Sequence, residues 1–212
     1  MGFTLRPATA SDARHIVEIY LSAFKDDSIS ILCFPRNQAV YDFWFSMIVE
    51  ELSDPHTHFI CVTSSDASGG DTVIAFAQWI APSKTTTPEL PTWPAGSDSE
   101  LANSFFGGLF STHKRLMDGR RHWYLELVAT RPEFQGKGAA GMLLRWGLEK
   151  ADGEGAESYL EASPEGKPIY ERFGFVAQEE LVVDLEGKGL EEKKYVEVFM
   201  VRPAQGKGQK AE

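Results

Sequence analysis

The sequence predicts a mixed α/β domain, and two observations carry this prediction. The first is the segment 127–144, which reads LVATRPEFQGKGAAGMLL: an apolar stretch, a turn with a proline, a loop rich in glycine and alanine, and an apolar helix. The second is the order of elements, in which helices and a β-hairpin are followed by a β-α-β-α-β-β series. No internal repeat or convincing linker divides the 212 residues, so we expect one domain over 1–203.

The first half of the chain predicts a strand, two helices and a hairpin. Residues 3–7 form a short strand that a proline closes, and a helix follows over about 11–24. A second helix fits 37–52, where aromatic residues recur at helical spacing. The runs 58–63 and 72–80 are rich in β-branched and aromatic residues and are joined by a segment of serines and glycines, which predicts a hairpin with a flexible tip.

The second half begins with a long loop over 81–99, which contains four prolines. Long ordered loops in compact domains often carry function. The remaining pattern predicts helices over 98–118, 139–151 and 167–173, and strands over 122–129, 158–162, 175–184 and 195–201. Residues 204–212 are expected to be a disordered tail.

Composition narrows the class of protein. The formal net charge is −10, from 21 basic and 31 acidic residues, which argues against nucleic acid or an anionic membrane as a partner. Cys33 and Cys61 offer no disulfide framework, and the five histidines show no ligand-like spacing, so we expect no metal. No apolar run is long enough to span a bilayer and no signal-peptide pattern is present, which makes the cytoplasm the expected location.

The glycine-rich loop has the residue types that hold a phosphate. Residues without a side chain, or with only a methyl group, let the backbone close around a diphosphate, and amides at a helix N-terminus can converge on its oxygens. These small residues are Gly136, Gly138, Ala139, Ala140 and Gly141. Lys137 adds a positive charge, and the side-chain amide of Gln135 can donate a hydrogen bond.

Other interpretations of this loop compete. A P-loop requires Ser or Thr after its lysine, whereas Lys137 is followed by Gly138. A Rossmann fingerprint does match Gly136, Gly138 and Gly141, so a dinucleotide-dependent enzyme is an alternative. The position of this loop past residue 130 argues against a dinucleotide-dependent enzyme, because a Rossmann loop usually follows the first strand. The remaining alternative is a helix start whose small residues serve close packing only.

Gln135 to Ala140 fits the pattern Gln/Arg-x-x-Gly-x-Gly/Ala and resembles the pyrophosphate loop of the GNAT superfamily, the acyl-CoA-dependent N-acetyltransferases. The block EASPEGKPIYERFGF over 161–175 resembles the strand-to-helix stretch that follows this loop, and LRPATASDA at the start is typical of the family. The resemblance implies the GNAT fold: a central mixed, mostly antiparallel sheet of six to seven strands with four to five helices. It also implies acetyl-CoA as co-substrate and a primary amine as acceptor.

The resemblance further implies the cofactor contacts, which fall on three segments. They are Leu127, Val128 and Thr130 on the strand, Gln135, Gly136, Lys137, Gly138, Ala139 and Ala140 in the loop, and Ser163 and Lys167 in the second block. In the family this strand splays from its neighbour and opens a slot for the cofactor. Ser163 stands where an asparagine is common, and it can bond the pantetheine arm or cap the helix.

Two residues are candidates for catalysis. Tyr170 corresponds to the tyrosine that in many family members protonates the departing CoA thiolate; the alternative is an aromatic core residue. Glu126 is the candidate general base, because a carboxylate within an otherwise apolar strand suits a base that works near neutral pH. It could instead face solvent or pair with a nearby arginine. His122 and Glu161 are the second choices for the base.

The acceptor site is expected from the first two helices, the proline-rich loop and the last hairpin. Aromatic residues there could form a wall for an amine or its apolar body; they are Trp93, Trp79, Phe24, Phe34 and Trp44, with core packing expected for Trp44 and Trp79. Asp26 and Asp27 could meet a cation or lie in a solvated loop. We expect a small-molecule amine. A protein acceptor, a non-catalytic acyl-CoA sensor and a homodimer stay open.

Overall fold

The computed structural model describes residues 2–65, 70–82 and 89–205. Within them, seven strands form one sheet in the order β1-β2-β3-β4-β5-β7-β6. All neighbouring strands run antiparallel except β4 and β5, which are parallel. The strands are β1 Phe3–Pro7, β2 Thr57–Ser65, β3 Asp71–Ile80, β4 His122–Thr130, β5 Glu157–Ala162, β6 Val176–Asp184 and β7 Lys194–Arg202. The mixed, mostly antiparallel sheet is thus confirmed.

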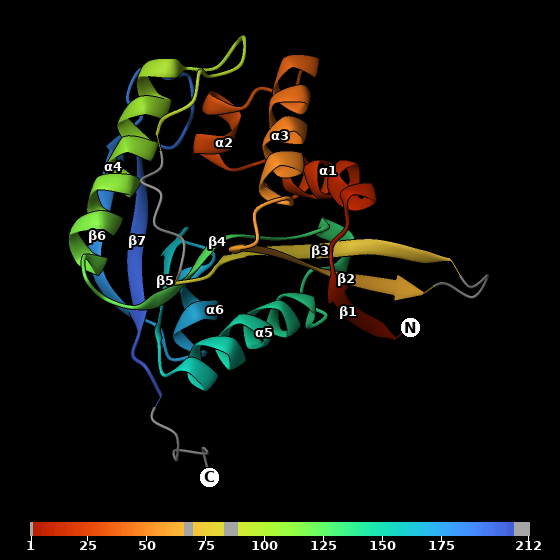
Figure 1. Cartoon of the computed structure of the whole chain (residues 1–212). Coiled ribbons are helices and arrows are strands. Elements are labelled where there is room, and N and C mark those ends of the chain that lie inside the picture. Colours follow the sequence, from red (N-terminus) through yellow and green to blue (C-terminus); the bar gives the residue numbers. More distant parts are fainter. Residues whose placement is uncertain (1, 66–69, 83–88, 206–212) are drawn as a thin grey trace.

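Helices cover both faces of the sheet (Figure 1). Those of the N-terminal half and the long helix α4 lie on one face, and α5 and α6 lie on the other. The helices are α1 Ala13–Ala23, α2 Ser28–Cys33, α3 Gln38–Glu51, α4 Ser99–Met117, α5 Ala139–Glu154 and α6 Lys167–Glu171. The described residues therefore contain one helix more than the four to five expected.

The additional helix is α2, which lies in a stretch for which the sequence predicted no element. It has only six residues, too few for a clear helical period. Asp27 begins it, because its Oδ1 accepts a hydrogen bond from the amide of Ser30 at 2.7 Å. An aspartate expected in a loop thus serves as a helix cap, and α2 brings this carboxylate next to the sheet.

The sheet opens between β4 and β5. Their parallel pairing runs from His122–Glu157 to Leu125–Leu160 and ends there. Beyond this point β4 continues along β3, with a register shift at Glu126, between Leu125 and Leu127, while β5 continues along β7. The two parallel strands separate, which is the splay that the resemblance implied.

Three expectations fall partly outside the described residues. They concern the tip of the hairpin at 66–69, the proline-rich loop at 83–88 and the C-terminal segment 206–212. The hairpin strands themselves, the remainder of the loop and the end of β7 lie within the described residues. No described helix has the length and apolar character that a transmembrane span requires.

Candidate active site

The glycine-rich loop forms an open cradle at the start of α5. Gly136 and Gly138 have φ values of +71° and +93°, and Gly138 is the residue that precedes the helix. This is the left-handed region that glycine adopts without strain. A Cβ added at either position would meet no atom within 4 Å, so the space in front of the loop is empty. The expected use of glycine in this turn is confirmed.

A cleft of about 740 Å³ runs from this cradle along the gap between β4 and β5. Its walls come from the end of β4, the loop, the first turn of α5, the segment around α6 and the turn between α1 and α2. Eight of the expected cofactor residues line it, namely Val128, Thr130, Gln135, Gly136, Gly138, Ala139, Ala140 and Ser163. Leu127, Lys137 and Lys167 do not.

The side chains of the loop are engaged within the protein. The Nζ of Lys137 donates to the carbonyl oxygen of Glu133 at 2.8 Å and lies 5.3 Å from the centre of the Phe134 ring. The side-chain amide of Gln135 donates to the carbonyl oxygen of Thr130 at 3.2 Å and ties the loop to the end of β4. Both side chains therefore brace the loop, which leaves the backbone amides facing the cleft.

The backbone of β4 presents two amides to the gap. Arg131 donates its amide to the carbonyl oxygen of Ile74 at 2.8 Å, on the β3 side. Because amides alternate in direction along a strand, those of Val128 and Thr130 point the other way, toward the gap. By the same alternation the amide of Leu127 lies on the β3 side, and Leu127 lines a different cavity.

Two arginines near the cradle were not among the expected residues. Arg172, just after α6, lines the cleft. The Arg145 guanidinium lies 3.5 Å from where a Cβ on Gly141 would be, so its side chain folds back over the first turn of α5. The spacing of four residues between Gly141 and Arg145 could have indicated this, because long helical side chains point toward the N-terminus of their helix.

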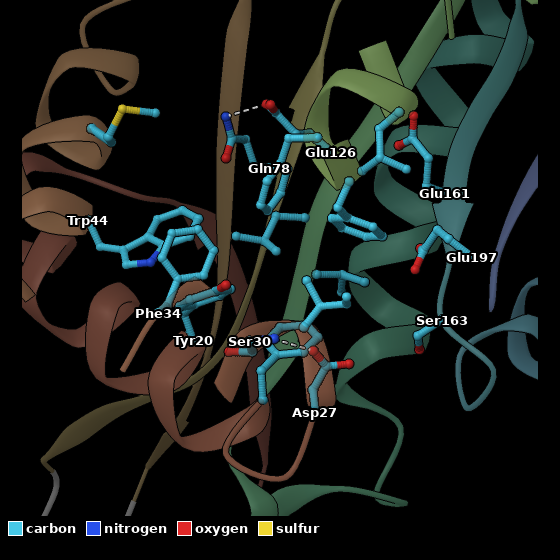
Figure 2. A pocket seen from close by; sticks show the side chains of 18 of the residues that line it. Tyr20, Asp27, Ser30, Phe34, Trp44, Gln78, Glu126, Glu161, Ser163 and Glu197 are labelled. Carbon is cyan, nitrogen blue, oxygen red and sulfur yellow. Dashed lines mark hydrogen bonds between the residues drawn. The ribbon is translucent and has the colours of Figure 1, made fainter. Parts of the chain in front are cut away.

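A second cavity, of about 260 Å³, lies between the sheet and helices α1 to α4. It adjoins the cleft, because six residues line both: Phe24, Asp27, Val128, Ser163, Tyr170 and Tyr195. We call it the acid–aromatic cavity, since carboxylates and aromatic rings form much of its lining. Figure 2 shows Glu161, Glu197 and Ser163 on one side, Trp44, Phe34 and Tyr20 on the other, and Glu126 and Asp27 between.

Tyr170 lies where the cleft meets the acid–aromatic cavity. Gly166 makes room for its ring, since a Cβ there would come within 2.8 Å of the tyrosine Cε2. Ser163 accepts a hydrogen bond on its Oγ from the amide of Gly166 at 3.2 Å, in the turn before α6, and α6 itself has no side-chain cap. Burial raises the pKa of Tyr170 above its usual value, and the nearby carboxylate of Glu197 adds to the shift. The phenol therefore keeps its proton at neutral pH.

Glu126 lies at the register shift on β4, and it lines the cavity. One of its carboxylate oxygens accepts a hydrogen bond from the side-chain amide of Gln78 at 2.7 Å (Figure 2). Of the two arginines nearest in sequence, Arg121 pairs with Glu154 and Arg131 pairs with Glu18. Glu126 is exposed and lines the cavity, so its carboxylate is reachable both from solvent, as one of the expected alternatives had it, and from the cavity.

Glu161 and Glu197 form a buried pair of carboxyl groups. Glu161 lies opposite Phe199 in the β5–β7 ladder, so Glu197 is its diagonal neighbour on the same face of the sheet. Glu161 accepts a hydrogen bond from the hydroxyl of Tyr159 at 2.7 Å. Burial raises the pKa of Glu161 to about 7 and that of Glu197 to about 8, to which the Glu161 charge also contributes.

Glu197 was missed from the sequence. It is 6% exposed and interrupts the apolar strand Tyr195–Val201, where a charged residue at an inward-facing position is the signal of a buried site. Asp27 also faces the cavity. It accepts a hydrogen bond from the Tyr195 hydroxyl at 3.0 Å, and burial raises its pKa. Asp26, by contrast, lines only the cleft and is exposed.

The aromatic wall consists of rings in mutual contact. The Trp44 ring lies 4.1 Å from that of Tyr20 and 5.1 Å from that of Phe34, between centroids. Trp93 and Phe24 line the cavity as well, so the expectation of an aromatic wall holds for four of its five members. Trp44 packs against the core as expected, and it lines the cavity as well. Trp79 is a core residue as expected, on the α5 face, where its indole donates to Leu143.

His122 lies outside the lining of both cavities. It begins β4, and its Nε2 is 2.8 Å from the Nε2 of His113 on α4. Burial lowers the pKa of both imidazoles, that of His113 to about 3. The pair thus joins α4 to the sheet in neutral form. In the described part of the chain, no group of three or more His, Cys, Asp or Glu side chains could hold a metal ion.

The sequence matches the family model described as "Acetyltransferase (GNAT) family" over residues 16–175. The chain therefore belongs to the GNAT family of acetyltransferases.

Solved structures share this fold. A Corynebacterium glutamicum protein described as histone acetyltransferase HPA2 and related acetyltransferase has a TM-score of 0.60 and 21% identity over 99% of this chain and 100% of its own. A phosphinothricin acetyltransferase from Sinorhizobium meliloti, solved with AcCoA, has a TM-score of 0.54 and 21% identity over 100% and 94%. An N-acetyltransferase from Staphylococcus aureus has a TM-score of 0.57 and 14% identity over 97% of this chain and 100% of its own. At these identities the likeness concerns the fold.

Proposed function

We propose that this protein is an acetyl-CoA-dependent N-acetyltransferase that transfers an acetyl group to the primary amine of a small molecule. One observation carries the proposal: the cleft that begins at the phosphate cradle meets the acid–aromatic cavity at Tyr170. A donor in the cleft and an acceptor in the cavity would come together at this junction. Membership of the GNAT family supports the reaction class.

The residues of the cleft fit coenzyme A. The backbone amides at Gly136 and Gly138 face an empty space at the N-terminus of a 16-residue helix, which favours a diphosphate. Arg145 and Arg172 supply positive charge beside it. The amides of Val128 and Thr130 face the gap, where an extended amide-containing arm can bond them. One of the structural neighbours was solved with AcCoA.

Acetyl-CoA supplies a thioester carbonyl, which a neutral amine can attack directly. The protein then has two proton transfers to perform. The Glu126 carboxylate, fixed by Gln78, takes a proton from the ammonium group of the acceptor, directly or through a water. The Tyr170 hydroxyl, held protonated by burial, gives its proton to the leaving sulfur. From the ammonium form, one C–N bond is formed, one C–S bond is broken, and the nitrogen loses two protons. Glu126 passes the first to solvent. The second leaves the nitrogen after the attack and balances the proton that Tyr170 gives to sulfur, so that the Tyr170 hydroxyl is restored.

The decisive experiment follows acetyl-CoA-dependent release of free thiol over a panel of primary amines. The wild type is expected to turn over one class of amine, and Tyr170→Phe to lower kcat by about 100-fold or more, as loss of a general acid does. The affinity for acetyl-CoA should not change. Tyr41→Phe is the matched control, because Tyr41 lines neither cavity. Full activity of Tyr170→Phe would contradict the assignment.

The same panel separates the alternatives. Binding of acetyl-CoA without turnover of any amine would indicate an acyl-CoA sensor. Turnover of peptide N-termini alone would indicate a protein acceptor, and binding of a nicotinamide dinucleotide without binding of CoA would indicate the Rossmann alternative.

Glu126→Gln is expected to lower kcat most at low pH, where little of the acceptor is neutral.

A further inference from the structure

Among the residues that the structure describes, the lining of the acid–aromatic cavity has five carboxyl groups and no cationic side chain. Its carboxyl groups are those of Asp27, Glu51, Glu126, Glu161 and Glu197, and none of its described lining residues is Lys, Arg or His. Arg36 lies close by but is used elsewhere: its guanidinium donates to the carbonyl oxygens of Phe34 at 2.7 Å and Phe24 at 2.6 Å. The described lining of the cavity thus offers a ligand several carboxyl groups and no cationic side chain.

Two of the carboxyl groups lie across the cavity from three of its aromatic rings. Figure 2 shows Trp44, Phe34 and Tyr20 across from Glu161 and Glu197. The indole nitrogen of Trp44 is buried and has no hydrogen-bond partner among the described residues. At about 260 Å³ the space suits a small ligand with one apolar end. Such a ligand would place its apolar body against the rings and its charge against the acids.

This distribution discriminates between amines. A buried carboxyl pair without a neighbouring cation is electrostatically incomplete, and an ammonium group placed against it completes it. A ligand that also carries a carboxylate or phosphate would bury that anion among five acidic side chains, with no described cation in the lining to pair it. The cavity therefore selects against amino acids, even though their amino groups are chemically similar.

We propose, building on the function above, that the acceptor is a primary amine with an aromatic or apolar body, without a carboxylate or phosphate. Glu161 and Glu197 hold its ammonium group, and Trp44, Phe34 and Tyr20 hold its body. Phosphinothricin, an amino acid named for one structural neighbour, is accordingly expected to be a poor acceptor for this protein.

The test compares amines with the amino acids from which they differ only by a carboxylate. Tryptamine is measured against tryptophan and phenethylamine against phenylalanine, with spermidine as a polycation. We expect kcat/KM for each amine to exceed that of its amino acid by about 100-fold or more, and spermidine to fall below both amines. Equal rates within a pair, or preference for spermidine, would overturn the proposal.

Two variants probe the two ends of the cavity. Glu197→Gln keeps the shape of the side chain at this buried position, so the fold should persist. Its KM for tryptamine should rise about 10-fold, since one partner of the ammonium is neutralised, while KM for acetyl-CoA stays constant. Met47→Lys places a cation at the partly exposed mouth, where Met47 is 36% exposed. It should improve the use of phenylalanine relative to phenethylamine.

A binding measurement separates this proposal from the proposed function. Calorimetry of tryptamine and tryptophan with the protein measures selectivity whether or not acetyl transfer occurs. Tighter binding of tryptamine without any thiol release would retain the ligand class and reject the acetyltransferase function. Acetyl transfer to both ligands, bound with equal affinity, would retain the acetyltransferase function and reject the proposed ligand class. If Glu197→Gln leaves the tryptamine affinity unchanged, the assignment of the carboxyl pair is wrong.

Discussion

Gly138 bears the strictest conformational demand in the cradle. It ends the loop with a φ of +93° and passes directly into α5, so its amide and those that follow are directed at the same open space. A side chain here would both strain the backbone and enter the volume where a diphosphate is expected. A substitution at Gly138 is therefore the most direct test of whether this loop binds acetyl-CoA.

We expect Gly138→Asp to weaken binding of acetyl-CoA by about 100-fold or more, because it brings a negative charge against the phosphates. Gly119→Asp is the matched control. Gly119 also has a positive φ, of +68°, and open space around it, but it lies in the turn between α4 and β4. The two variants should lose similar stability, and only the first should lose affinity in calorimetry. Unchanged affinity of Gly138→Asp would reject the cradle.

At the scale of elements, α5 is placed by a close contact with the sheet. Gly147 is buried against the indole of Trp79, and a Cβ at this position would come within 2.1 Å of its ring. Trp79 is fully buried and donates to the carbonyl oxygen of Leu143 one turn earlier in α5. The helix can approach β3 this closely only because residue 147 has no side chain. This contact helps to fix the helix whose first turn carries the cradle.

Gly147→Ala is therefore expected to destabilise the protein, by about 1–3 kcal/mol or more, because a well-packed core resists added volume. Gly153→Ala in the same helix is the control: a Cβ there meets nothing within 4 Å. Because alanine has a higher helix propensity than glycine, Gly153→Ala should stabilise the protein by about 0.5–1 kcal/mol. Urea denaturation of both variants gives the comparison, and equal effects in the two would contradict the packing argument.

At the scale of the whole molecule, buried ionisable groups set opposite limits on stability. Glu161 and Glu197 have pKa values raised from 4.5 to about 7 and about 8. Between pH 4.5 and these raised values, both carboxyl groups are deprotonated in the unfolded chain and protonated in the folded protein, so stability falls as pH rises. The pKa of His113 is lowered from 6.5 to about 3. In that range the unfolded chain binds a proton that the folded protein does not, so stability falls as pH decreases.

The two effects oppose each other between pH 4.5 and 6.5, but two glutamates act there against one histidine. We therefore expect stability to fall slowly as pH rises from 4.5 to 6.5, to fall more steeply above pH 6.5, and to fall again as pH decreases below 4.5. Each group contributes up to about 1.4 kcal/mol per pH unit. Asp12 adds to the acid limb, because its bonds to Arg6 hold the pKa of its carboxyl below the usual range. The free energy of unfolding between pH 4 and 9 tests this. Glu197→Gln should flatten the alkaline limb only; an unchanged limb would contradict the burial argument.

Most of the fold was predictable because its signals are local. Runs of β-branched residues marked the seven strands, and helical spacing marked the long helices. Only α2 was missed, since six residues are too few to show a period. The phosphate cradle was predictable for a similar reason: the positive φ values at Gly136 and Gly138 are a property that glycine brings to its own position.

The acceptor side was not predictable from local pattern. Glu197 acquires its meaning from Glu161, a residue on another strand, through the register of β5 with β7. Trp44 looked like a core residue, and its place on the cavity wall depends on how α3 packs over the sheet. Likewise, no sequence pattern indicated that Lys137 would bond the Glu133 carbonyl.

The sequence by itself thus determined the elements, the family and the cradle, because backbone preference and short motifs act over a few residues. The tertiary structure decided which charges share one cavity, which rings face them, and that no described cation lines that cavity. Burial and pairing depend on residues far apart in the chain, and they set the protonation of Glu161, Glu197 and Tyr170. The choice of acceptor depends on these long-range contacts.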